Sequence, residues 1–153
     1  MKRDRFALLV PVALLFVACG GSGGAPVNGN INGTWSAQLA IPDGVVLYSF
    51  SSTLTQGNGS AVSVSNLSFS PAVACFPAPT VQTATFTVTG NVGGVQTGTF
   101  GMSISAAGSE AQNTLTLTGA RTSSGWISGT WTLVGVSGCT GHGSYVMKPA
   151  STA

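Results

Sequence analysis

The chain has 153 residues with only 5 lysines and arginines and 3 acidic residues, for a net charge of +2. Lys2, Arg3 and Arg5 with Asp4 account for that surplus, so residues 6–153 are neutral overall. No basic stripe is left to neutralise phosphates, and we expect no nucleic-acid partner. Few helix formers, abundant threonine and valine, and 22 glycines favour an all-β domain.

Residues 1–18 have the form of an export signal, with a basic start followed by the apolar run 6–18. The run is too short to cross a bilayer as a helix. Its end, Phe16-Val17-Ala18-Cys19, resembles the lipobox of bacterial lipoproteins, in which the signal is removed and the new N-terminal cysteine carries lipid. The resemblance implies cleavage before Cys19 and a membrane anchor through lipid on that cysteine. The alternative is an ordinary secretory signal in which Cys19 is incidental.

Residues 19–30 follow as a Gly- and Ser-rich tether, before a single β domain at 31–149 and a tail at 150–153. Gly20 stands directly after the cysteine. In the lipoproteins of Gram-negative bacteria, glycine at that position implies transfer to the outer membrane. The resemblance therefore leads us to expect a cell-envelope protein anchored at the outer membrane, with its periplasmic or surface orientation open.

Beyond the tether, short segments alternate apolar and hydroxyl-bearing residues and are separated by turn signals at 42–44, 56–59 and 90–94. The parity of the apolar residues changes within the third segment, which predicts a β-bulge near Asn66. The eight predicted strands centre on residues 32–40, 46–54, 62–69, 84–88, 100–104, 115–117, 127–133 and 145–147.

Each predicted strand has one apolar face and one polar face, mostly threonine, which is typical of antiparallel sheets with one buried side. Eight consecutive strands with short links predict an antiparallel up-and-down barrel, which closes to remove its edges. A two-sheet β-sandwich is the alternative fold and has nearly the same pattern. A barrel spanning the outer membrane would need aromatic girdles and a charged lumen, whereas here the aromatic residues are scattered and charges are few.

Cys75 and Cys139 remain as a pair if Cys19 carries lipid, and an exported chain meets an oxidising compartment. We therefore predict a disulfide between them, which closes a loop of 64 residues. They lie in the third-to-fourth and seventh-to-eighth links, which leave an up-and-down barrel at the same end. The alternatives are two free thiols, or a metal pair with His142, three residues after Cys139.

The first predicted strand begins with Ile31-Asn32-Gly33-Thr34-Trp35 and continues with Gln38-Leu39. It is similar to the first strand of avidin-type biotin-binding barrels, and a Gly-x-Trp opening also occurs in lipocalins. The resemblance implies an eight-stranded meander barrel. It does not extend to biotin, because Gly129-Thr130-Trp131 on the seventh predicted strand lacks the polar cluster that a biotin pocket requires.

Ionisable side chains are too few for a catalytic constellation: one His, two carboxylates, one Lys and one Arg follow the apolar run. Asp43 is explained by its turn, and Glu110 has no predicted partner. His142, between two glycines, is interpreted as an exposed turn residue. We therefore expect no enzyme, no metal site and no cofactor.

Two functions stay open. The first is a binding module whose barrel cavity holds a small apolar ligand, lined by aromatic residues that otherwise form the core: Trp35, Tyr48, Phe50, Phe86, Phe100 and Trp131. The second is a structural or interaction lipoprotein that contacts an envelope protein or glycan, which includes inhibition of an exported protease. Trp126 has the opposite parity to Ile127, so we expect it to be exposed and to offer a surface contact.

Overall fold

The computed structural model describes residues 29–71, 73–77, 79–108, 112–136 and 138–150. The predicted signal 1–18, Cys19, the tether up to residue 28, Glu110 and the tail after Ala150 lie outside these ranges. Within them, no helix is long and apolar enough to cross a membrane.

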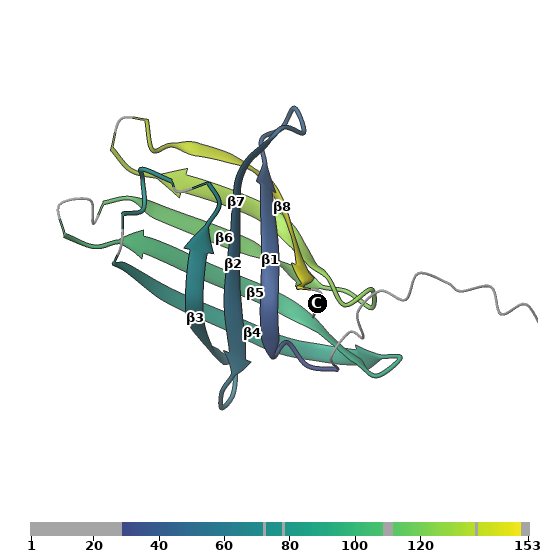
Figure 1. The fold of residues 1–153 in the computed structure, drawn as a ribbon. Coiled ribbons are helices and arrows are strands. Elements are labelled where there is room, and N and C mark those ends of the chain that lie inside the picture. Colours follow the sequence, from purple (N-terminus) through teal and green to yellow (C-terminus); the bar gives the residue numbers. More distant parts are fainter. Residues whose placement is uncertain (1–28, 72, 78, 109–111, 137, 151–153) are drawn as a thin grey trace, which may run out of the picture.

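Eight antiparallel strands form the fold, and each pairs with the next along the chain. They are β1 (Gly33–Ala40), β2 (Val46–Gln56), β3 (Ala61–Phe69), β4 (Thr80–Val92), β5 (Val95–Ala106), β6 (Thr114–Arg121), β7 (Ile127–Val134) and β8 (Gly141–Pro149). β8 returns to pair with β1, with Met147 opposite Ala37, and the sheet closes. The predicted up-and-down barrel is confirmed, and the β-sandwich alternative is wrong. Figure 1 shows β1–β3 crossing in front of β4–β7 at a steep angle.

Successive strands run in opposite directions, so their links divide between the two ends of the barrel. The disulfide end comprises the links 41–45, 70–79, 107–113 and 135–140. The tether end comprises the links 57–60, 93–94 and 122–126, with Gly29, where the described chain begins, and Ala150, where it ends. The chain therefore enters and leaves the barrel at the same end.

Strand alternation places the apolar face of the sheet inside the barrel. Five aromatic side chains are at most 2% exposed there: Trp35, Phe50, Phe86, Phe100 and Trp131. Threonines such as Thr87 and Thr116 point outward and are exposed. This polarity is the reverse of a membrane-spanning barrel, whose outer band is apolar and whose lumen is polar.

The turn between β4 and β5 is tighter than the sequence pattern predicts. Gly93 and Gly94 form the whole turn, and their φ angles of 60° and 84° suit a two-residue hairpin. Val92 pairs directly with Val95. The predicted turn at 90–94 is therefore too long, because β4 continues past Gly90, where a register shift absorbs the irregular residue.

The predicted bulge in the third strand is confirmed at Asn66, whose φ of 52° is left-handed. Ser51 and Thr53 of β2 lie opposite Ser68 and Ser65, so β3 has one extra residue across this step. A bulge bends its strand and increases the local twist. It lies in the stretch of β3 that turns away from β4.

Candidate functional site

β3 and β4 separate along most of their length. Within the described residues they pair at two positions, Ala61 with Thr85 and Val62 with Ala84. Beyond these positions β3 stays paired with β2, and β4 stays paired with β5. The closed barrel therefore has a seam, which we define as the diverging stretches 63–69 of β3 and 80–83 of β4.

A cavity of about 540 Å³ opens in this seam at the disulfide end, and we call it the seam pocket. It is lined by Leu67, Ser68, Phe69, Val73, Ala74, Phe76, Pro77 and Thr80. Phe76 is buried and Phe69 is half-buried, whereas Ser68 and Pro77 are exposed at the rim. The volume lies within the range of about 300–1,000 Å³ that is usual for small-molecule sites.

Aromatic stacking attaches the wall of the seam pocket to the barrel core. Phe76 stacks on Phe69, with ring centroids 5.3 Å apart and planes 8° from parallel. Phe69 in turn meets Phe50 edge-on at 5.6 Å. Because Phe50 is 2% exposed inside the barrel, the link that carries Phe76 packs against the interior rather than lying loose on the surface.

The pocket has a small polar edge on β4. The Gln82 side-chain amide donates to the Thr80 carbonyl at 2.9 Å and also to the Thr80 hydroxyl. The Ser68 hydroxyl lies across the seam on β3. An apolar chamber with a few hydroxyl groups suits a ligand that is mainly apolar and carries one or two polar groups.

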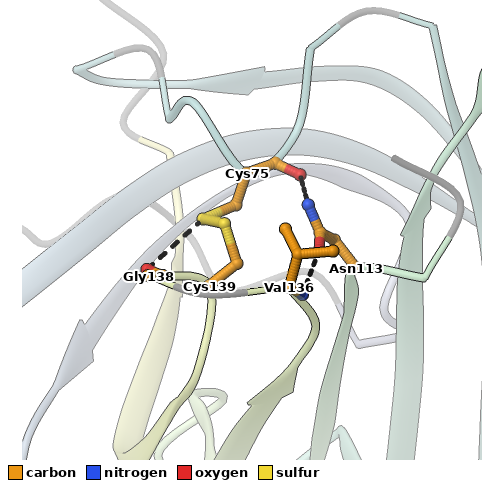
Figure 2. The surroundings of a disulfide bond; sticks show 5 residues. All are labelled: Cys75, Asn113, Val136, Gly138 and Cys139. Atoms are coloured by element: carbon orange, nitrogen blue, oxygen red, sulfur yellow. Dashed lines mark hydrogen bonds between the residues drawn. A yellow bond between two sulfur atoms is a disulfide. The ribbon is translucent and has the colours of Figure 1, made fainter. Parts of the chain in front are cut away.

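The predicted disulfide between Cys75 and Cys139 is confirmed, and it joins the β3–β4 link to the β7–β8 link. Figure 2 shows Asn113, which is fully buried, beside this bond. Its Nδ2 donates to the Cys75 carbonyl at 2.9 Å, and its Oδ1 accepts from the Val136 amide at 3.0 Å. The alternatives of free thiols or a metal pair at Cys139 are wrong. Three links are held together here, next to the pocket wall.

Arg121 closes the opposite end of the barrel and is only 2% exposed. Its Nε donates to the Gly125 carbonyl at 3.3 Å, and its Nη1 donates to the carbonyls of Gly29 at 3.2 Å and Gln96 at 3.4 Å. The guanidinium carbon lies 5.6 Å from the centre of the Trp35 ring. Burial lowers the pKa of Arg121, because desolvation penalises the charged form.

The six aromatic residues predicted to form a cavity or the core lie inside the barrel. None of them lines the seam pocket. Tyr48 is half-buried and meets Trp131 edge-on at 5.8 Å, and the other five are buried. The indole nitrogens of Trp35 and Trp131 donate to the carbonyls of Ile31 and Ala40. These contacts are those of a packed core.

Trp126 lies on the β6–β7 link and is 44% exposed. The Lys148 ammonium lies 4.0 Å from the centre of its ring, which is cation–π geometry. The indole face is thus paired with a cation at the tether end. Its use as a surface contact stays a prediction.

His142 does not lie in a turn, as the sequence interpretation held, but in β8 opposite Thr132, where it is exposed. Its flanking glycines make room for a neighbour: a Cβ at Gly143 would lie 2.9 Å from the indole nitrogen of Trp131. Packing, rather than a turn, therefore explains these glycines. Across the described ranges, no three His, Cys, Asp or Glu side chains are grouped as a metal site.

No protein-family model, curated protein or solved structure matches this chain. Sequence reasoning missed the seam pocket and the roles of Asn113 and Arg121. A signal existed for the two residues, since both have the parity of Leu115 and Leu117, which face inward. The sequence contains no such signal for the seam. The alternation of apolar and polar residues along a strand is the same whether the strand pairs with its neighbour or diverges from it.

Proposed function

We propose that this chain is a lipid-anchored binding protein of the bacterial cell envelope, and that it holds a small apolar ligand in the seam pocket. The observation that carries the proposal is the 540 Å³ chamber between β3, the Cys75 link and β4. The chamber replaces the barrel interior as the ligand site, because the interior aromatic residues pack against one another.

The lining sets the class of ligand. Leu67, Phe69, Val73 and Phe76 provide an apolar surface, and none of the described lining residues is charged. A charged ligand would lose hydration without gaining a counter-ion, so it is disfavoured. The expected ligand is neutral and mainly apolar, with a hydroxyl or carbonyl group toward Ser68 or Thr80.

The location rests on separate observations. The segment Phe16-Val17-Ala18-Cys19 resembles a lipobox, and lipid on Cys19 would hold the barrel at a membrane. The Cys75–Cys139 disulfide supports export, because such bonds persist in oxidising compartments. The outer membrane is the proposed location on the basis of Gly20.

Mass spectrometry of protein purified from membranes in mild detergent tests both parts of the proposal. The denaturing spectrum is expected to give a chain that starts at Cys19 and carries acyl groups, and Cys19→Ser is expected to abolish them. The native spectrum is expected to give a small molecule bound in one copy. A chain without acyl groups contradicts the anchor, whatever the state of the pocket.

A neutral fluorescent probe, N-phenyl-1-naphthylamine, tests the pocket directly. We expect saturable binding to the wild-type protein and its loss in Val73→Trp, because the indole would fill the chamber. Val134→Trp is the matched control, since Val134 is 67% exposed and lies outside the pocket. Equal binding to both variants contradicts the ligand function.

That negative result would favour the interaction role instead. The threonine-rich outer face of β4–β7, or Trp126, would then contact an envelope protein, a glycan or an exported protease. Cross-linking in intact cells from position 126 would identify such a partner.

A further inference from the structure

The position at which the chain enters the barrel is fixed by Arg121. Its guanidinium donates to the carbonyl of Gly29, the first described residue, and to the carbonyl of Gly125 on the β6–β7 link. Gly29 also accepts from the Gln96 amide at 2.7 Å, which ties it to the β4–β5 hairpin. Trp126 directly follows Gly125, so this exposed residue lies on the same β6–β7 link that Arg121 connects to Gly29. In Figure 1 the chain enters on the side of the β4–β5 and β6–β7 hairpin tips.

The surface around this point combines aromatic, cationic and apolar groups. Trp126 is 44% exposed, with the Lys148 ammonium over its ring, and Val92 at the tip of the β4–β5 hairpin is 54% exposed. Tryptophan favours the membrane–water interface because its ring is amphipathic. Lysine is attracted by anionic headgroups, with the strength of this attraction falling within a Debye length.

Charges are segregated along the barrel. Among the described residues, the two Lys and Arg side chains, Arg121 and Lys148, lie at the tether end. The one described carboxylate, Asp43, lies in the β1–β2 link at the disulfide end. An anionic surface would therefore attract the tether end and repel the other end.

We propose that Trp126, Lys148 and Val92 form a face that docks on the surface of the bilayer that holds the anchor. The inference rests on the proposed lipid at Cys19. Gly29 is ten positions after Cys19, and a Gly/Ser-rich chain of that length spans about 16–19 Å as a coil. Because the anchor keeps this face at a high effective concentration near lipid, a weak contact is sufficient to hold it there.

Docking through this face gives the barrel an orientation. The tether end lies on the headgroups, and the disulfide end points away from the bilayer. The seam pocket, which opens at the disulfide end, then faces the aqueous compartment. Ligand would enter it from water or from a soluble partner, rather than directly from the membrane.

Fluorescence quenching in vesicles tests the docked face. Full-length lipidated protein is placed in vesicles of phosphatidylcholine with brominated acyl chains, with or without phosphatidylglycerol. The emission of Trp126 is the difference between wild type and Trp126→Phe, since Trp35 and Trp131 are buried in both. We expect strong quenching of the Trp126 emission, and weaker quenching in Lys148→Gln only when phosphatidylglycerol is present.

The matched control moves the indole to the other end. In the Trp126→Phe background, Val134→Trp places an exposed indole at the disulfide end, and we expect its emission to be unquenched. Quenching of the tryptophan at both positions contradicts the docked face, and so does the absence of quenching at both positions in protein whose mass includes acyl groups. Neither result contradicts the lipid anchor. A chain without acyl groups overturns both the docked face and the anchor. A shift of Trp126 emission that follows protein concentration at fixed lipid indicates a second copy as the occupant and also overturns the proposal.

Discussion

The two ends of the barrel are closed by different side chains, Asn113 just before β6 and Arg121 at its last position. At the disulfide end, Asn113 is neutral and joins the Cys75 link to Val136, beside a covalent bond. At the tether end, Arg121 is charged and gathers the carbonyls of Gly29, Gln96 and Gly125 without any covalent support. Both side chains are at most 2% exposed.

The difference follows from what each end must hold. Arg121 is long enough to reach three backbone segments, so one side chain fills and closes the tether end. The disulfide end has a long link that departs from the sheet to form the seam pocket, and strand pairing does not hold it there. This end is therefore closed by the Cys75–Cys139 disulfide and by the hydrogen bonds of Asn113, which together connect three links.

Removal of the disulfide is expected to cause the largest loss of stability among the changes at the two ends. Cys75→Ala with Cys139→Ala releases a loop of 64 residues, and we expect a loss of about 4 kcal/mol of unfolding free energy from chain entropy. Urea unfolding followed by tryptophan fluorescence measures the loss. The variant is also expected to bind N-phenyl-1-naphthylamine less tightly, because Phe76 in the pocket wall follows Cys75.

Reduction of the wild-type protein is the control for the two substitutions. Reduced wild type and the double alanine variant are expected to unfold at the same urea concentration. If both keep the stability of the oxidised protein, the links are held by Asn113 and packing alone, and the proposed role of the cross-link is contradicted.

The sequence predicts much of this fold because alternation encodes which face of a strand is buried. It identified eight strands, the interior position of Trp35 and the bulge at Asn66, since these depend on local pattern. It also identified the disulfide, from export and an even count of remaining cysteines. The predicted length of the β4–β5 turn was wrong, because Gly90 is a residue typical of turns but lies in β4.

The seam pocket could not be predicted in this way. It arises where β3 and β4 diverge, and that depends on the twist of the whole barrel rather than on either strand. Arg121 has the parity of the inward face, but a charged residue is rarely buried unless it has partners, and its carbonyl partners come from three separate segments: Gly29 before β1, Gln96 in β5 and Gly125 in the β6–β7 link. Gly29 and Gln96 are distant from Arg121 in sequence, so composition and spacing give no sign of them.

Arg121→Met is expected to cause the second-largest loss of stability, and it acts at the tether end. Methionine is close in volume but cannot donate, so the carbonyls lose their charged partner, and we expect a loss of about 3 kcal/mol. Arg121→Lys, which keeps the charge but not the fork of donors, is expected to fall between the variant and wild type. Hydrogen exchange at the Gln96 amide, which donates to Gly29, should accelerate more than exchange at the Val136 amide.

If Arg121→Met and wild type were equally stable, the hydrogen bonds of Arg121 would make no net contribution to the stability of the tether end. The cost of burying the guanidinium would then match what its hydrogen bonds return, as happens in some buried ion pairs. The tether end would be closed by packing around Trp35 rather than by the charge.

Asn113→Ala is the corresponding change at the disulfide end, and we expect a smaller loss of about 2 kcal/mol. The substitution removes the donor to Cys75 and the acceptor for the Val136 amide, but the disulfide still joins their links. Exchange at the Val136 amide should accelerate while exchange at Gln96 follows global stability alone. When Asn113→Ala is combined with the two cysteine substitutions, the loss of unfolding free energy should exceed the sum of the separate losses. Each restraint holds the same links, so the links separate fully only when both restraints are removed.

Tyr145→Phe, between the two ends, is expected to have the smallest effect at neutral pH and a distinct effect in alkali. Tyr145 is 1% exposed, and its hydroxyl has no hydrogen-bond partner among the described residues. Burial raises the pKa of Tyr145, because desolvation penalises the phenolate. At neutral pH the removal of a buried, unpaired hydroxyl should change stability by less than about 1 kcal/mol.

Above about pH 10, where an unfolded tyrosine ionises, the unfolded chain loses a proton that folded Tyr145 retains. The unfolded state then binds fewer protons than the folded state, so wild-type stability falls as pH rises. Tyr145→Phe removes this contribution, and its unfolding midpoint in urea should decline less between pH 9 and pH 11 than that of wild type. Parallel declines in the two proteins would mean that the phenol reaches solvent or a proton acceptor in the folded state. In that case, the middle of the barrel would be less tightly closed than either end.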